Sequence, residues 1–180
     1  LSNIAICGEK SENGTIRVAV QEIESAASAE YALYSSLSPY GFRGKAITEI
    51  LASLHSTGKT WTSETHQLVT DRDCILIREK QTEVFQGMKI PETGCYVLPR
   101  GEKIKLSIRE REIDFSPSKE KFLITLDADV VTFPLHLRLA QNGDTFHPFG
   151  MKGKKLVSDY LTDRKKNLFE KQSQLVLEDA

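Results

Sequence analysis

Residues 25–55, "SAASAEYALYSSLSPYGFRGKAITEILASLH", contain the clearest periodic pattern of the sequence. Apolar residues recur three or four positions apart in 25–38 and again in 43–55, which is the spacing of a helix with one buried face. Pro39 and Gly41, in the intervening "SPYGF", both interrupt a helix. The stretch therefore predicts a helical hairpin.

Strand patterns flank this hairpin on both sides. Upstream, "TIRVAVQEI" (15–23) alternates apolar and polar residues, as a half-buried strand does. Downstream of Trp61, short runs rich in Val, Ile, Thr and aromatic residues are separated by turn residues. These runs are "THQLVT" (65–70), "CILIRE" (74–79), "CYVLP" (95–99), "IKLSIRE" (104–110), "FLITLD" (122–127) and "VVTFPLHLRL" (130–139).

The helical pattern and the strand patterns together predict an α+β protein. We expect residues 1–90 to form a linker and helical-hairpin region with short strands, and we place a boundary near "KIPETG" (89–94). Residues 91–180 are expected to form a small β-rich domain, resembling a sandwich or barrel, with one or two short helices.

Composition limits the class of protein. The chain has 180 residues, of which 39% are hydrophobic and 27% charged, as in an ordinary globular protein. Neither a membrane-spanning apolar run nor a secretory signal pattern is visible, so we expect a cytoplasmic protein without membrane partners. The three cysteines are widely spaced and are expected to be buried, reduced thiols. Because the sequence begins at Leu1, we expect a part of a larger protein.

Enzyme motifs are incomplete in this sequence. Gly58-Lys59-Thr60 matches the end of a phosphate-binding P-loop, but Ser53 stands where that loop needs its first glycine. The four histidines are too far apart for the spacing of a zinc site on one helix. "DRD" (71–73) pairs two carboxylates beside a turn, which favours a solvated edge over acid/base chemistry. We therefore predict no catalytic residue, no metal ligand and no cofactor site in this chain.

Positive charge is concentrated in the second half, around "FHPFGMKGKKLVSDYLTDRKK" (146–166). Residues 152–171 include seven basic and three acidic residues, a local charge of +4, whereas the whole chain carries −1 and the remainder therefore −5. Such asymmetry favours a polyanionic partner on one face, although a solvated basic helix end gives the same pattern. Apolar spacing predicts a helix over 154–162 that buries Leu156, Val157, Tyr160 and Leu161.

The segment "NGDTFHPFGMKGKKLVSDYLTD" (142–163) resembles the signature of the C-terminal domain of bacterial tRNA(Ile)-lysidine synthetases. That signature runs Gly-Asp, an aromatic, Pro, Gly-Met-Lys-Gly, a Lys, and Ser-Asp. The matching positions are Gly143, Asp144, Phe146, Pro148, Gly150, Met151, Lys152, Gly153, Lys155, Ser158, Asp159 and Asp163. Upstream, "TGKTWTSETHQLVTDRDCILI" (57–77) is similar to the segment that joins the helical and C-terminal parts of the family. The chain departs from the family at "LRLAQ" (137–141), where an Arg-rich lead is usual.

The resemblance implies a part of an ATP-dependent ligase that attaches lysine to the wobble cytidine of the minor isoleucine tRNA, whose anticodon is CAU. The product is lysidine. ATP with Mg is implied for an N-terminal catalytic domain that this sequence does not include. The fragment is therefore expected to be inactive alone, and its implied partners are this tRNA, through the acceptor stem, and its own catalytic domain.

We expect this chain to position tRNA through the basic stretch. Phosphate contacts are assigned to Lys152, Lys154, Lys155, Arg164, Lys165 and Lys166, with close backbone approach at Gly150 and Gly153 and a contact from Ser158. Asp144, Pro148 and Asp159 are expected to order the loop, because a carboxylate facing phosphate would repel it. An alternative stays open: the chain serves as an interaction or homodimerisation module, in which 25–55 packs against its copy.

Overall fold

The structure is a computed structural model that describes residues 9–10, 14–81, 85–99, 101–108, 123–126, 128–129, 131–148 and 150–179. Its contacts divide the chain into two units, the first formed by Leu1–Glu83 with Lys165–Glu170 and the second by Val84–Arg164 with Lys171–Ala180. Each unit has its own hydrophobic core. The domain boundary expected near residue 90 stays a prediction.

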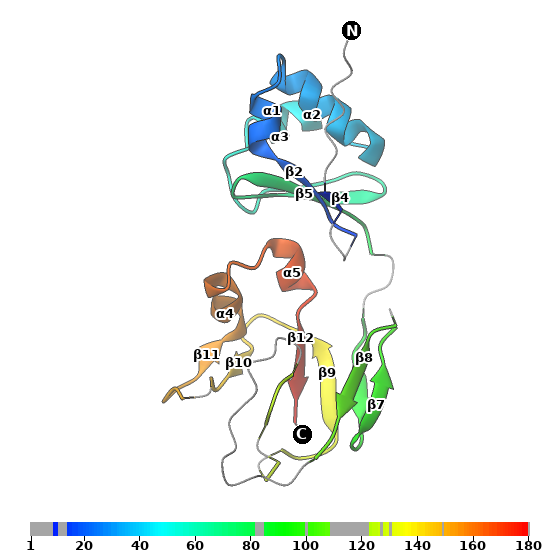
Figure 1. Ribbon diagram of the computed structural model, residues 1–180, viewed down its shortest axis with the longest axis vertical. Helices are drawn as coiled ribbons and strands as arrows, with labels where there is room; N and C mark the ends of the chain where they lie inside the picture. The colour runs from blue at the N-terminus through cyan, green and yellow to red at the C-terminus, as the bar shows by residue number, and fades with distance from the viewer. Residues whose placement is uncertain are drawn as a thin grey trace. The chain divides into compact units, whose positions relative to one another are not determined.

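The first unit packs helices against a five-stranded antiparallel sheet with the order β1-β2-β5-β4-β3. Helices α1, α2 and α3 lie on one face of this sheet (Figure 1). The elements in chain order are β1 (Glu9–Lys10), β2 (Ile16–Ala19), α1 (Val20–Glu24), α2 (Ala29–Leu37), the 3-10 helix η1 (Ser38–Tyr40), α3 (Lys45–Leu51), β3 (Thr60–Thr62), β4 (His66–Asp71) and β5 (Cys74–Glu79).

The predicted helical hairpin is present as α2 and α3. Helix α2 begins where the Ser28 side chain accepts a hydrogen bond from the Tyr31 amide at 3.3 Å, which caps the first turn. The hairpin turns through η1, after which Gly41 adopts a φ of +83°. A Cβ at Gly41 would lie 3.1 Å from the Cβ of Ser63, so the positive φ and this tight contact both favour glycine there.

The strand expected over 15–23 is shorter than the alternation suggested. Strand β2 ends at Ala19, and Val20–Glu24 form helix α1 instead. Val20 and Ile23 are both buried and lie three residues apart, a spacing that puts them on one face of a helix but would put them on opposite faces of a strand. The Val20 amide donates to the Asp73 carbonyl at 2.8 Å, which holds the start of α1 beside the residue that precedes β5.

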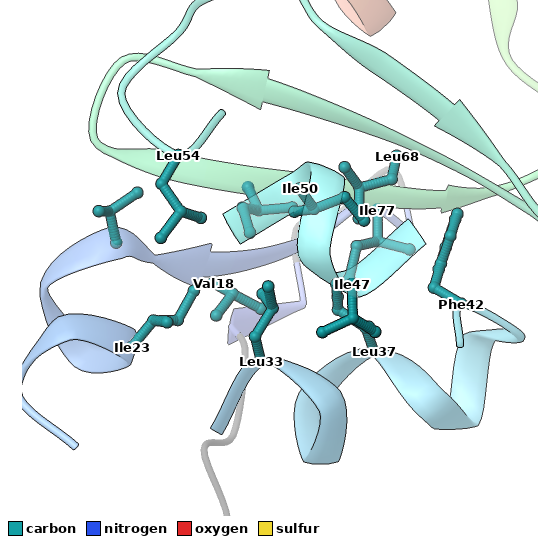
Figure 2. Packing of buried hydrophobic residues seen from close by; sticks show 12 residues of the cluster. Val18, Ile23, Leu33, Leu37, Phe42, Ile47, Ile50, Leu54, Leu68 and Ile77 are labelled. Carbon is teal, nitrogen blue, oxygen red and sulfur yellow. The ribbon is translucent and has the colours of Figure 1, made fainter. Parts of the chain in front are cut away.

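The central strands bury both of their faces. Leu68, Ile75 and Ile77 belong to the core under the helices, and the alternate residues Val69 and Leu76 belong to a smaller cluster. Figure 2 shows side chains of α2 and α3 directed at β2, β4 and β5. The continuous apolar run "CILI" in an antiparallel strand therefore follows from cover on both sides of the sheet.

The described residues of the second unit form three small antiparallel sheets, with strand orders β12-β9-β6, β7-β8 and β10-β11. Its elements are β6 (Met88–Ile90), β7 (Gly94–Val97), β8 (Lys103–Leu106), β9 (Leu135–Leu139), β10 (Thr145–Phe146), β11 (Lys155–Leu156), α4 (Val157–Asp163) and β12 (Leu175–Glu178). Helix α5 (Leu168–Gln172) is shared, because its first residues belong to the first unit and its last residues to the second. Ile90, Leu98, Leu135 and Leu137 form the core of the second unit.

This architecture confirms the α+β class with two short helices near the end of the chain. The described strands do not close into a barrel. Two local predictions are wrong: residues 123–126 of "FLITLD" do not form a strand, and Cys95 is exposed although Cys74 is buried. In the described part of the chain, every helix is too short or too polar to span a lipid bilayer.

Candidate nucleic-acid interface

The Gly-Met-Lys-Gly segment is the loop of a β-hairpin. Strands β10 and β11 pair antiparallel, with Phe146 opposite Lys155, and enclose the loop 147–154. A turn opens this loop, because the Met151 amide donates to the Pro148 carbonyl at 3.1 Å and Gly150 has a φ of +79°. Lys152 and Lys154 follow the turn, and both are exposed. The hairpin therefore places two lysines and two glycines in solvent.

Asp144 anchors the base of the hairpin. Its carboxylate accepts two hydrogen bonds from the Arg138 guanidinium, Nη1 to Oδ2 at 2.8 Å and Nη2 to Oδ1 at 3.0 Å, and one from the Gln141 amide at 2.7 Å. The Asp144 carbonyl accepts the Val157 amide at 2.8 Å, which ties β10 to the start of α4. Asp144 is expected to order the loop by capping or by pairing with a nearby lysine, and in the structure its charged partner is Arg138.

Arg138 binds a second carboxylate as well. Its Nε donates to Glu178 Oε2 at 2.9 Å, and its Nη2 contacts the same oxygen. The hydrogen bonds that Arg138 donates, chiefly to Asp144 and then to Glu178, raise the pKa of Arg138, and those to Asp144 lower the pKa of Asp144. Because two carboxylates occupy the guanidinium, we assign Arg138 to the scaffold of the hairpin. No local sequence pattern points to Glu178, which lies 40 residues from Arg138.

Helix α4 begins later than its apolar pattern predicted. It runs from Val157 to Asp163, because Lys155 and Leu156 form β11. Leu156 is 39% exposed, contrary to the prediction, whereas Leu161 is buried as expected. Strand β11 therefore separates the glycine loop from the helix, and the first amide of the helix is already bonded to Asp144.

Tyr160 organises the surface beside the hairpin. Its ring meets Phe146 edge to face, with centroids 5.3 Å apart. Arg164 Cζ lies 5.3 Å from the ring centroid and Lys155 Nζ 6.0 Å, and Lys155 Nζ also contacts Asp163 Oδ2 at 2.6 Å. Such cation–π contacts stabilise an exposed pair by about 0.5–1 kcal/mol. The predicted cations Lys155 and Arg164 are thus brought together around one aromatic ring.

Lys165 and Lys166 lie in the other unit. The Lys165 carbonyl accepts Arg72 Nη2 at 2.6 Å, and Lys165 is exposed with a φ of +55°. Lys166 Nζ contacts Glu170 Oε1 at 2.6 Å. Partial burial raises the pKa of Glu170, but its hydrogen bonds from Lys166 and the Asn167 amide outweigh this and lower it. The basic stretch is therefore divided between the two units.

The remaining predicted residues lie on the first turn of α4. Ser158 and Asp159 are both exposed, and the Ser158 carbonyl accepts the Thr162 hydroxyl at 2.8 Å. Asp159 is the acidic residue of this turn, where a negative charge complements the helix dipole.

The P-loop-like triplet leads into β3 and is hydrogen-bonded to β4. The Gly58 amide donates to the Thr70 carbonyl at 2.7 Å, and the Lys59 amide donates to Thr70 Oγ1 at 3.2 Å. These amides are already bonded, so the segment does not fit a triphosphate. Among the described residues, no three His, Cys, Asp or Glu side chains are grouped in a way that could hold a metal ion.

Comparisons with known proteins agree on one family. A family model described as "TilS substrate binding domain" matches residues 10–80. The tRNA(Ile)-lysidine synthase of Parabacteroides distasonis is 40% identical over 151 residues, which cover 79% of this chain and 33% of the relative. That of Bacteroides thetaiotaomicron is 38% identical over 146 residues, covering 81% and 32%, respectively. The chain thus spans about a third of the length of these relatives. On these matches, the chain is similar to a part of the tRNA(Ile)-lysidine synthases.

Proposed function

We propose that this chain positions the minor isoleucine tRNA, through its acceptor stem, for lysidine formation by a cytoplasmic ATP-dependent ligase. The observation that carries the proposal is the exposed hairpin loop with Lys152 and Lys154, held on an ordered base by Asp144. Lysine ammonium groups on a projecting loop fit phosphates, which dominate affinity for nucleic acid. In this proposal ATP, Mg and the catalytic groups belong to the part of the relatives that this chain does not span.

The match to the family model extends the proposed tRNA contact to the first unit. The matched residues 10–80 lie within this unit, and the name of the family model describes substrate binding. Lys165 is exposed in the same unit. We therefore propose that both units contact the tRNA, the second unit through the hairpin loop and the first through residues that include Lys165.

The test is fluorescence anisotropy with the minor isoleucine tRNA at several salt concentrations. We expect Lys152→Ala with Lys154→Ala to weaken binding. We also expect the slope of log affinity against log salt concentration to become shallower by about one for each lysine removed. The matched control is Lys103→Ala with Lys105→Ala, which removes the same charge from exposed positions of β8 in the same unit. Equal losses in both double variants would show that net charge, and not the hairpin loop, determines affinity.

A second candidate function rests on one observation. Helix α2 exposes two aromatic side chains three residues apart, Tyr31 at 68% and Tyr34 at 45%, next to the buried Leu33 and Leu37. An aromatic pair exposed on one helix is typical of a contact with another protein surface. A dimer in light scattering that is lost in Tyr31→Ser with Tyr34→Ser, without measurable tRNA affinity, would favour a dimerisation module.

A further inference from the structure

The Lys155 side chain differs from those of the two loop lysines. Its Nζ is 2.6 Å from Asp163 Oδ2, and its side chain is only 27% exposed, whereas that of Asp163 is 64% exposed. Lys152 and Lys154 are both exposed in the loop that ends where Lys155 begins β11. The three lysines of the segment therefore belong to two environments, a solvated loop and a partly buried ion pair.

The ion pair ties β11 to the far end of α4. Asp163 is the last residue of this helix, where the helix dipole disfavours a negative charge, and a cation nearby offsets that cost. Lys155 supplies the cation from β11, opposite Phe146 in the ladder. The first residue of the helix is held separately, through the Val157 amide and the Asp144 carbonyl. Both ends of α4 are thus attached to the hairpin.

We infer that Lys155 is a positioning residue and not a phosphate ligand. With Asp163 it fixes the base of the hairpin against α4, and this presents Lys152 and Lys154 to the nucleic acid. The Phe146–Tyr160 contact reinforces the same junction, since Phe146 pairs with Lys155 and Tyr160 lies on α4. The inference rests on the proposed function and replaces the direct phosphate contact that the family resemblance suggested for Lys155.

The direction in which Asp163→Asn changes tRNA affinity distinguishes the two roles of Lys155. If Lys155 binds phosphate, Asp163→Asn removes a competing carboxylate and raises tRNA affinity. If Lys155 positions the loop, the same variant lowers affinity by about twofold to fivefold, the range expected from an ion pair at the protein surface, although the protein becomes more positive. Glu102→Gln is the matched control, because it makes the same charge change at an exposed position between β7 and β8.

Two further variants test the pair itself. Lys155→Ala is expected to weaken binding without changing the salt slope, whereas Lys152→Ala lowers the slope by about one. Exchanging the two charges, Lys155→Asp with Asp163→Lys, is expected to restore affinity, because the pair forms again at the same junction. A phosphate ligand at position 155 would not be restored by that exchange, so a doubly substituted protein as weak as Lys155→Asp overturns the inference.

A measurement without RNA keeps the inference testable if affinity is low. We expect the amide NMR signals of Gly150 and Gly153 to shift in Lys155→Ala and in Asp163→Asn but not in Glu102→Gln. Unshifted signals would mean that the ion pair does not position the loop. Loss of affinity in the Lys152 and Lys154 variants together with an unaffected Asp163→Asn would reject this inference alone. No effect of the Lys152 and Lys154 variants would reject the proposed function itself.

Discussion

At the scale of single residues, Asp144 carries the clearest stability prediction. Its side chain is 16% exposed and accepts three hydrogen bonds, two from Arg138 and one from the Gln141 amide. We expect Asp144→Asn to lower the free energy of unfolding at pH 7 by about 1–3 kcal/mol, because it removes a charge-assisted bidentate pair. Urea unfolding measures this loss, and Asp179→Asn, at an exposed position after β12, is the control.

The pH dependence of the same variant has a definite sign. The pKa of Asp144 in the folded protein lies below its usual value of 3.8, chiefly because Arg138 donates to its ionised form. Its contribution to stability is therefore fully present above about pH 4 and is lost as the pH falls through the folded pKa. The difference in unfolding free energy between wild type and Asp144→Asn should be constant from pH 7 to pH 5 and shrink below pH 4. A difference that already disappears at pH 5 would assign the effect to another group.

The sequence predicts Asp144 as an ordering residue but does not predict its partner. Arg138 and Asp144 lie six positions apart on either side of a turn, and nothing in their spacing distinguishes Arg138 from a nearby lysine. Glu178 reaches Arg138 only because β12 pairs with β9. Side-chain partners that depend on such pairing follow from the three-dimensional structure and not from local pattern.

At the scale of elements, α5 is anchored by one aromatic residue. Phe169 is buried at 3% exposure in a cluster with Val69, Cys74 and Leu76, on the sheet face opposite the main core. The Cζ atom of Arg78 lies 4.2 Å from the centroid of the Phe169 ring, and Arg78 Nη1 donates to the Phe169 carbonyl at 3.3 Å. At the start of α5, Asn167 and Glu170 exchange two hydrogen bonds of 2.9 Å, a reciprocal cap.

We therefore expect Phe169→Ala to be strongly destabilising. Loss of a buried phenylalanine costs about 3–5 kcal/mol, because a cavity remains where the ring was packed. Phe169→Leu retains most of the volume and should cost under about 1.5 kcal/mol. Denaturant unfolding monitored at Trp61, which packs against the main core of the first unit, measures both variants. Equal stability of the two variants would mean that α5 is not held to the sheet by this side chain.

Elements with several turns of periodicity were predictable, and two-residue elements were not. The helical hairpin follows from apolar spacing over 25–55 with a proline and a glycine between its helices. Strands β10 and β11 have two residues each, too few to show alternation, so Leu156 was assigned to the helix that follows. Their pairing across the loop 147–154 is what moves the start of α4 to Val157.

At the scale of the whole molecule, the basic stretch is continuous in sequence but not in structure. Lys152 to Arg164 belong to the second unit, whereas Lys165 and Lys166 belong to the first, where Phe169 packs on the sheet. Phe169 follows three basic residues as an isolated aromatic residue, and no sequence pattern indicates that the chain comes back to the first unit there. The sequence therefore predicted the content of the candidate site and not its division between units.

This division leads to a quantitative prediction for RNA binding. Of the six cations assigned to phosphate, Lys155 and Lys166 are paired with carboxylates at 2.6 Å, which leaves Lys152, Lys154, Arg164 and Lys165 exposed. Each phosphate contact contributes about −0.7 to −0.9 to the slope of log affinity against log salt concentration, so four contacts give a slope on the order of −3. Anisotropy titrations with the minor isoleucine tRNA between about 50 and 200 mM salt measure this slope. A slope near −5 would mean that both paired lysines leave their carboxylates to bind phosphate, and a slope near zero would remove the basic stretch from the interface.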